Sequence, residues 1–202
     1  MKQPEITHIL FDIGGVLTFL PQFDFLEVDK KFALTPGQTE QIFHDCFRVQ
    51  TDNKEIDLEA YFNANHSQHL HYKEYQKMLK EIYGGEKLNN ELVDWIRNHK
   101  NEYSFSVLSN NSAVLNDVLK EKFHIYDDFD HIFNSAEIGL VKPNPEIFHF
   151  VLDKLNVPAI QCLFVDDRLD NVEAARSVGL TALQFISNEQ FFEDIKKVIS
   201  IE

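Results

Sequence analysis

Ile6-Thr7-His8-Ile9-Leu10-Phe11-Asp12-Ile13-Gly14-Gly15-Val16-Leu17-Thr18 is the stretch that decides the fold of this chain. A short apolar run ends in one carboxylate, Asp12, and then in two glycines. Such a run is typical of a buried strand in a parallel sheet, and an Asp at its carboxyl end would lie where open α/β sheets bind ligands. Asp and Gly are also common turn residues, so the stretch alone is equally compatible with an ordinary turn. The remainder of the chain decides between these two interpretations.

Length and composition indicate one substantial core, or a core domain that carries a smaller insert. The chain has 202 residues, of which 44% are apolar and 18 are Phe. No apolar run approaches the roughly 18 residues that a membrane helix needs, and the first residues lack a secretory signal pattern. Cys46 and Cys162 lie far apart without metal-type spacing. We therefore expect reduced, structural thiols and a cytoplasmic location.

The charge balance is strongly acidic and excludes some classes of partner. The formal net charge is −14, from 33 acidic and 19 basic residues. Nucleic acids and anionic membranes attract basic surfaces, so we expect neither as a partner. A small anionic substrate is compatible with this charge, because a metal ion and one lysine can invert the potential locally.

The segment after Thr18 has a helical pattern for about seventy residues. Apolar spacing predicts four helices, with Thr35 as N-cap and Pro36 as first residue of the second, and Asp57 as N-cap of the third. Gly84-Gly85 ends the last of them. Consecutive helices without intervening strands indicate a separate helical subdomain. The predicted helices cover residues 23–34, 36–49, 58–70 and 72–83.

From Lys87 onward, strands alternate with helices of about ten residues. This pattern predicts the α/β class with a doubly wound parallel sheet. We therefore expect two parts, a core of residues 1–18 and 87–202 and an inserted helical cap of residues 19–86. The predicted strands cover residues 105–108, 131–133, 162–165 and 181–186, and the predicted helices cover 89–100, 113–123, 145–155, 170–178 and 189–199.

Three of the predicted strands end in polar clusters. These are Asp12, the pair Ser109-Asn110 and the pair Asp166-Asp167, and Lys142 stands just ahead of a further helix. The carboxyl ends of parallel strands meet at one edge of a sheet, so the clusters would share one cleft. The alternative for each cluster alone is a solvated strand end, a helix cap or a surface lysine.

The charges in such a cleft call for a cation. Asp12, Asp166 and Asp167 carry three negative charges against the single positive charge of Lys142. Two uncompensated like charges about 5 Å apart would cost on the order of 3 kcal/mol at an effective dielectric constant near 20. A divalent cation removes this cost, and ligands that are all oxygen favour Mg²⁺ over zinc. A carboxylate nucleophile, a Lewis acid and a lysine are the components of phosphoryl transfer.

Four motifs, in order and spacing, resemble those of the haloacid dehalogenase (HAD) superfamily. The nearest branch is similar to small sugar-phosphate phosphatases and to the phosphatase domains of epoxide-hydrolase type. In that branch a helical cap follows the first motif, which corresponds here to about residues 19–86. The resemblance implies a HAD Rossmann-like core. The motifs are FDIGGVLT (11–18), VLSNNS (107–112), GLVKPNPEIF (139–148) and FVDDRLDN (164–171).

The resemblance implies a nucleophile and a Mg²⁺ site. Asp12 would form an aspartyl-phosphate intermediate. The carboxylates of Asp12 and Asp167, with the backbone carbonyl of Gly14, would hold Mg²⁺. Asp166 would be a further ligand or a partner of the ligands.

The resemblance also implies a site for the substrate phosphate. Ser109 and the Asn110 amide would hydrogen-bond the phosphoryl oxygens, and Lys142 would neutralise charge between nucleophile and phosphate. Asn171 would orient the carboxylates. The implied substrate is a small phosphorylated metabolite, with sugar phosphates among the candidates.

One residue departs from the superfamily pattern. Gly14 replaces the second Asp of the usual DxD, which is the general acid and base of the superfamily. Such help is worth about 10²–10⁴ in rate. We therefore predict a slow enzyme, a substrate with a good leaving group, or a substitute acid from the cap, such as a histidine.

Other interpretations remain open at this point. One is a 2-haloacid dehalogenase-type hydrolase, which the acidic Asp166-Asp167 pair disfavours, and another is a phosphate-binding regulatory protein that has lost turnover. His66 and His69, on one predicted helical face, are weak candidates for a second metal site because they lack acidic or Cys neighbours. The phenylalanines of the cap favour core packing over a substrate site; they are Phe23, Phe25 and Phe32.

Overall fold

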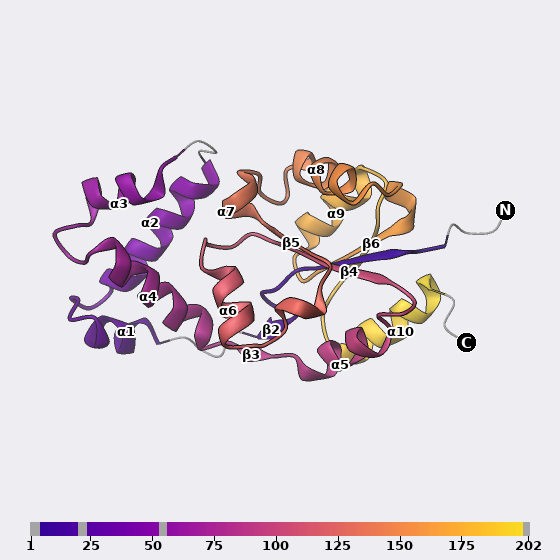
Figure 1. Ribbon diagram of the computed structural model, residues 1–202, viewed down its shortest axis with the longest axis horizontal. Helices are drawn as coiled ribbons and strands as arrows, with labels where there is room; N and C mark the ends of the chain where they lie inside the picture. The colour runs from indigo at the N-terminus through magenta and orange to yellow at the C-terminus, as the bar shows by residue number, and fades with distance from the viewer. Residues whose placement is uncertain (1–4, 20–23, 53–55, 200–202) are drawn as a thin grey trace.

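The fold is a parallel α/β sheet with a helical unit at one end. The computed structural model describes residues 5–19, 24–52 and 56–199. A five-stranded parallel sheet has the order β5-β4-β1-β6-β7 (Figure 1). The predicted α/β class is thereby confirmed. The strands are β1 (His8–Phe11), β4 (Ser104–Ser109), β5 (His131–Asn134), β6 (Cys162–Asp166) and β7 (Thr181–Gln184).

Successive residues of the central strands enter two different cores, because side chains of a strand alternate between its faces. Ile9 and Phe11 pack with α5 (Asn90–Asn98), α6 (Leu115–Glu121) and α10 (Asn188–Val198). Leu10 packs on the opposite face with α8 (Pro145–Leu155) and α9 (Leu169–Ser177). Figure 1 shows α8 and α9 above the sheet and α5 and α10 below it. The sheet is therefore doubly wound.

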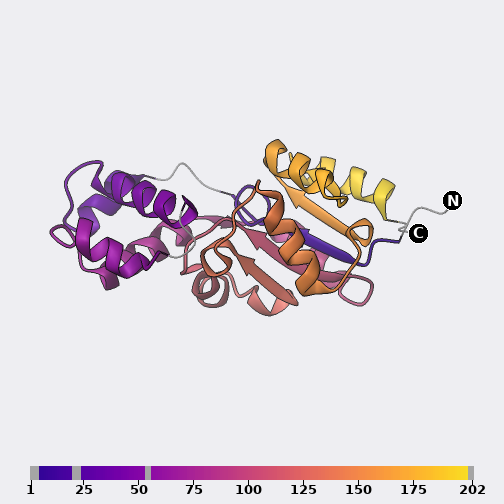
Figure 2. The same cartoon turned by 90° about the horizontal axis from the view of Figure 1, so that it is seen from above.

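Four consecutive helices form a unit beyond the carboxyl ends of the strands (purple in Figures 1 and 2). This group is called the helical unit. Its helices are α1 (Phe25–Lys31), α2 (Gln38–Asp52), α3 (Leu58–Asn65) and α4 (Tyr72–Gly84). Aromatic packing holds them together, as in the stacked rings of Phe62 and Tyr75, 4.7 Å apart. Phe25 and Phe32 pack against this core as expected, whereas Phe23 lies outside the described residues. Asp57 caps α3, as predicted, by accepting a hydrogen bond from the Ala60 amide.

The start of α2 differs from its prediction. The helix begins at Gln38, and Thr35-Pro36-Gly37 form a turn instead of a helical start. The buried carboxylate of Asp29 accepts hydrogen bonds from the amides of Gly37 at 2.6 Å and Thr39 at 2.7 Å. Because α1 supplies this carboxylate, a tertiary contact takes the place of the predicted local cap.

Two short strands join the helical unit to the sheet. β2 (Thr18–Phe19) and β3 (Lys87–Leu88) pair antiparallel with each other. They lie at the two predicted domain boundaries, and the division into core and cap stays a prediction. Three smaller elements also escaped the sequence patterns, namely α7 (Ser135–Ile138) and the 3-10 turns Tyr126–Asp128 and Ala159–Gln161. Within the described ranges, no helix combines the length and apolar character needed to cross a membrane.

Candidate functional site

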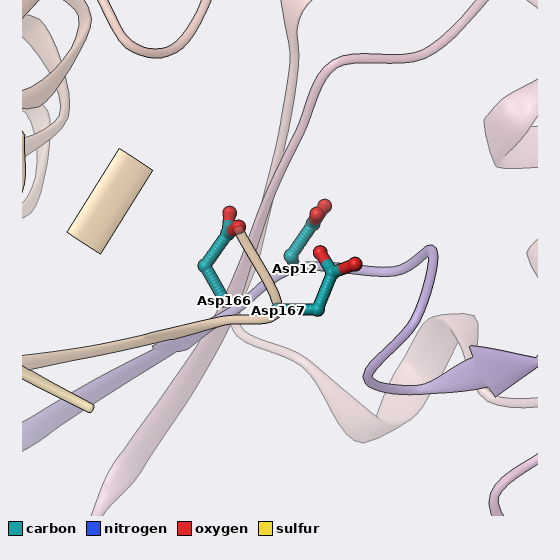
Figure 3. A group of neighbouring side chains, drawn as sticks. All are labelled: Asp12, Asp166 and Asp167. Carbon is teal, nitrogen blue, oxygen red and sulfur yellow. The ribbon is translucent and has the colours of Figure 1, made fainter. Parts of the chain in front are cut away.

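Three carboxylates meet at the carboxyl ends of β1 and β6. Asp12 directly follows β1, Asp166 is the last residue of β6, and Asp167 follows it. Each offers an oxygen, and these oxygens lie within 4.8 Å of one another. Figure 3 shows the three side chains side by side and pointing in the same direction. The sheet register causes this meeting, since Phe11 is paired with Val165 and the Asp12 amide donates to the Val165 carbonyl at 2.9 Å.

A buried lysine holds two of these carboxylates. The ammonium group of Lys142 lies 3.0 Å from Asp12 Oδ1 and 2.7 Å from Asp166 Oδ2. It also donates to the Leu108 carbonyl at 2.8 Å, and its side chain is completely buried. A buried ammonium is costly unless all its protons are bonded, and these three acceptors satisfy them. The cleft thus keeps a fixed positive charge beside Asp12.

The side chain of Asn110 positions this lysine by bonding to the Lys142 backbone. The Asn110 side chain donates to the Lys142 carbonyl at 2.8 Å and accepts from the Lys142 amide at 2.9 Å. The end of β4 and the loop before α8 are thereby joined. Because the side-chain amide of Asn110 is used here, contact with a phosphate would fall to its backbone N–H. Ser109, the last residue of β4, is buried beside it.

Asn171 orients Asp166 from the first turn of α9. Its amide nitrogen lies 3.0 Å from both carboxylate oxygens of Asp166, and the Arg168 amide donates to one of them at 2.9 Å. The Asn171 side-chain oxygen is buried and has no hydrogen-bond partner among the described residues. The oxygen donors of the carboxylate cluster fit a hard divalent cation such as Mg²⁺.

Burial and like charge favour proton uptake by the carboxylates of the site. Burial, with a smaller effect from Asp166, raises the pKa of Asp12 to about 6, although Lys142 opposes this rise. Burial and the neighbouring Asp166 also raise the pKa of Asp167. The negative charges of the cluster thus exceed what Lys142 neutralises, and a cation bound between them would remove the excess.

The loop Ile13–Thr18 closes on itself and places Gly14 and Gly15 at the site. The Gly15 amide donates to the Thr18 carbonyl at 2.7 Å, and the Thr18 amide donates to the Ile13 carbonyl at 2.8 Å. Gly15 has φ +77°, and a Cβ there would lie 2.6 Å from Asp167 Oδ2. This close approach explains the second glycine of the motif.

Glu86 is a buried residue near the site that the sequence patterns did not indicate. It is 9% exposed and accepts a hydrogen bond from the Thr18 hydroxyl. Burial raises the pKa of Glu86, the Thr18 hydrogen bond lowers it, and the charge of Asp12 raises it further. No local signal could have identified Glu86, because its partner lies on the other connection between helical unit and sheet.

The histidines of the helical unit lie away from the cluster. Helix α3 ends at Asn65, so His66 is its C-cap and the predicted shared helical face of His66 and His69 is wrong. His66 Nε2 lies 2.9 Å from Asp45 Oδ2, within the helical unit. No histidine is among the described residues that line the cavity at the site, and a substitute acid from the cap stays a prediction.

Comparison with known proteins points to the same family as the motifs. A family model of haloacid dehalogenase-like hydrolases matches residues 6–179. A D-ribitol-5-phosphate phosphatase from Bacteroides thetaiotaomicron is 24% identical over 200 residues, which cover 89% of this chain and 91% of that protein. A sesquiterpene phosphatase from Aspergillus oryzae is 35% identical over 81 residues, covering 40% of this chain and 41% of that protein. A drimenol cyclase from Aspergillus calidoustus is 37% identical over 83 residues, which cover 41% of this chain and 16% of the cyclase.

Solved structures share the fold over nearly the whole chain. A predicted HAD-like family hydrolase from Porphyromonas gingivalis has a TM-score of 0.75 at 22% identity, covering 98% of this chain and 100% of that one. A HAD family enzyme from Bacteroides thetaiotaomicron, in complex with magnesium and inorganic phosphate, has a TM-score of 0.70 at 21% identity, covering 91% and 96%. With its motifs, its sheet order and its carboxylate cluster, the chain belongs to the haloacid dehalogenase-like hydrolase family.

Proposed function

We propose that the protein is a Mg²⁺-dependent phosphatase that hydrolyses a small phosphorylated metabolite through an aspartyl-phosphate on Asp12. The observation that carries this proposal is the Lys142 ammonium, which lies 3.0 Å from Asp12 and 2.7 Å from Asp166 inside the three-carboxylate cluster. A nucleophilic carboxylate beside a fixed cation and a divalent-metal site is suited to phosphoryl transfer. The phosphatases among the relatives, and the similar structure with bound magnesium and phosphate, support it.

In the first step, a carboxylate oxygen of Asp12 attacks phosphorus while the bond from phosphorus to the ester oxygen breaks. Lys142 stays beside Asp12 and balances charge as the phosphoryl group arrives. The Ser109 hydroxyl and the Asn110 backbone N–H are proposed to donate to phosphoryl oxygens. Mg²⁺ bound by Asp12, Asp167 and the Gly14 carbonyl would supply Lewis-acid stabilisation of the phosphoryl charge, with Asp166 as a further ligand or partner.

The second step restores the enzyme. Water attacks the phosphorus of the aspartyl-phosphate, and inorganic phosphate and the Asp12 carboxylate are released. Gly14 has no side chain to protonate the leaving oxygen or to activate this water, so both proton transfers fall to solvent. Substrates with good leaving groups, such as glycosyl or acyl phosphates, are therefore expected to react fastest.

The names of the relatives cover organic groups of very different kinds. They include a ribitol-phosphate phosphatase, a sesquiterpene phosphatase and a flavin mononucleotide hydrolase from Arabidopsis thaliana. What these names share is the phosphate ester. The proposed substrate class is therefore a small phosphorylated metabolite, sugar phosphates included.

The test is release of inorganic phosphate from a panel of sugar, polyol, acyl and aryl phosphates, with Mg²⁺ and with EDTA. We expect Mg²⁺-dependent release that Asp12→Asn reduces at least about 10³-fold, because the nucleophile is lost. Asp153→Asn, at an exposed carboxylate of α8, is the matched control and is expected to retain full activity.

Absence of release from every substrate, or full activity of Asp12→Asn, would overturn the proposal. A parallel assay with a 2-haloacid in EDTA tests the dehalogenase alternative. Halide release there would assign carbon–halogen hydrolysis instead. Mg²⁺-dependent binding of a phosphorylated ligand without turnover would assign a binding role.

A further inference from the structure

The wall of the cavity beside the carboxylate cluster contains two phenylalanine side chains. The cavity has a volume of about 510 Å³. Among the described residues, the helical unit contributes a single aromatic ring to its wall, Phe47 of α2, and β2 contributes Phe19. The other described residues of the wall belong to the site or its rim; they are Asp12, Gly14, Gly15, Asn110, Lys142, Asp167, Arg168 and Asn171.

Both rings line the cavity and also pack against other aromatic side chains. Phe47 stacks on Phe43, with centroids 6.2 Å apart and planes inclined by 15°, and Phe43 packs in turn against Tyr83 at 6.1 Å. Phe19 is 39% exposed and packs against Phe185 at 6.4 Å. Burying the exposed part of these two rings against an apolar group is favourable, because it removes apolar surface from water.

The polar side-chain groups that the wall exposes are already engaged, apart from those assigned to phosphate and metal, and the unpartnered side-chain oxygen of Asn171 is buried. Arg168 stands at the rim, but its guanidinium makes two hydrogen bonds to the Asp170 carboxylate, at 3.1 and 2.7 Å. The side chains of Asn110 and Lys142 bond within the site. A polyol buried against this wall would leave hydroxyl groups without partners, which is costly.

We propose that the substrate is a phosphate monoester whose organic part is apolar and ring-containing, and that Phe47 and Phe19 bind that part. The inference rests on the proposed phosphatase function, and it narrows the substrate class to aromatic-type esters in preference to sugar and polyol phosphates. Phe47 is the specificity-determining residue, since it is the described side chain that the helical unit places in the cavity.

The first test measures binding without turnover. Calorimetry with Mg²⁺ compares two phosphonates that cannot be hydrolysed, benzylphosphonate and 2,3-dihydroxypropylphosphonate. We expect benzylphosphonate to bind about tenfold more tightly, which is the size of effect that aromatic contacts of this kind give. Equal binding, or tighter binding of the dihydroxypropyl compound, overturns the inference.

Substitutions in the cavity wall test which residues cause the preference for benzylphosphonate. Phe47→Ala is expected to weaken benzylphosphonate binding about tenfold and to leave the dihydroxypropyl compound unchanged, whereas Phe47→Leu retains most of the preference. Phe19→Ala provides an independent second variant. Phe150→Ala removes an aromatic ring of α8 that is not part of the cavity wall and should change neither affinity. A preference unchanged in folded Phe47→Ala and Phe19→Ala contradicts the assignment of these rings.

A kinetic comparison separates this inference from the proposed function. Benzyl phosphate and glycerol 1-phosphate are hydrolysed with Mg²⁺, and kcat/KM is expected to favour benzyl phosphate about tenfold. Hydrolysis of both without that preference refutes the inference and supports the function. No hydrolysis of either, with the binding preference intact, refutes the function and supports the apolar site.

Discussion

Gly14 occupies the position at which the superfamily pattern carries a second Asp, two residues after the proposed nucleophile. It lines the cavity, and a Cβ added there would meet no atom within 4 Å. A larger side chain can therefore be accommodated without displacing the cluster. Packing around residue 14 therefore does not exclude a side chain at this position.

Gly14→Asp is expected to raise kcat for alkyl phosphates with poor leaving groups by about 10²-fold, the lower end of general acid catalysis. An acyl phosphate, whose leaving group needs no proton, should show little change and serves as the control substrate. The measurement is steady-state phosphate release with both substrates and Mg²⁺. An unchanged rate on the alkyl esters in the folded variant would show that Gly14 does not limit proton transfer.

Gly15 serves a different purpose, because its backbone lies close to Asp167 of the carboxylate cluster. With φ +77° and a Cβ position 2.6 Å from Asp167 Oδ2, Gly15→Ala would both strain the loop and displace the carboxylate. We expect at least about tenfold weaker Mg²⁺ affinity by calorimetry, together with about 1 kcal/mol lower stability.

Gly37→Ala is the matched control for Gly15→Ala. Gly37 has φ +85° but no atom within 4 Å of its Cβ position, and it lies between α1 and α2. The Gly37→Ala variant should lose about as much stability as Gly15→Ala and should keep the Mg²⁺ affinity of the unmodified protein. If both variants bind Mg²⁺ like the unmodified protein, the contact between Gly15 and Asp167 does not matter for the metal site.

At the scale of elements, the carboxylate cluster is connected to the helical unit by the loop that follows Asp12 and by the paired strands β2 and β3. Thr18 bonds through its backbone to Ile13 and Gly15 and through its hydroxyl to Glu86. Asn89 strengthens the same junction by donating from its side chain to the Val16 carbonyl at 2.9 Å. The loop that presents Gly14 is therefore held from both connections of the helical unit.

Glu86→Gln tests the buried carboxyl of this junction. Because burial raises the pKa of Glu86 in the folded state, the fold favours the neutral form, and its stabilising effect is lost as pH rises through that pKa. The Gln variant stays neutral and can still accept from Thr18. In EDTA, we expect its Tm to exceed that of the unmodified protein by about 2–4 °C at pH 8 and to equal it at pH 4.

Thermal melts followed by circular dichroism measure this difference. Glu173→Gln, at an exposed position of α9, is the control and should give the same small change at both pH values. A Tm difference for Glu86→Gln that does not depend on pH would mean that the fold does not raise the pKa of Glu86.

At the scale of the whole molecule, the acidic cluster links metal binding to stability. The chain carries a net charge of −14, and three of its carboxylates lie together at the edge of the sheet. A cation that binds the folded state alone stabilises it by about 2.7 kcal/mol at a hundredfold excess over its Kd. We therefore expect saturating Mg²⁺ to raise Tm by about 5–10 °C relative to EDTA.

Scanning calorimetry of the unmodified protein and of Asp167→Asn checks this expectation. The variant should lose most of the Mg²⁺-dependent rise, because it removes one of the proposed ligands. In EDTA it should melt no lower than the unmodified protein, since one of the repelling charges is gone. Equal melting temperatures with Mg²⁺ and EDTA would contradict a metal site in the cluster.

The amino-acid sequence by itself predicts the parallel α/β sheet and the meeting of Asp12 with Asp166 and Asp167. Both follow from local patterns: apolar runs form buried strands, and the carboxyl ends of parallel strands share one edge. The family motifs depend on the same short stretches. Sequence reasoning therefore succeeds where a property is encoded within a few neighbouring residues.

Only the tertiary structure decides which partners those residues have. The placement of Lys142 between two carboxylates, the bond from Thr18 to Glu86, and the start of α2 at Gln38 all depend on groups from distant segments. The same holds for the position of Phe47 in the cavity wall. The physical reason is that contacts between segments distant in the chain depend on how the elements pack together, which no local periodicity records.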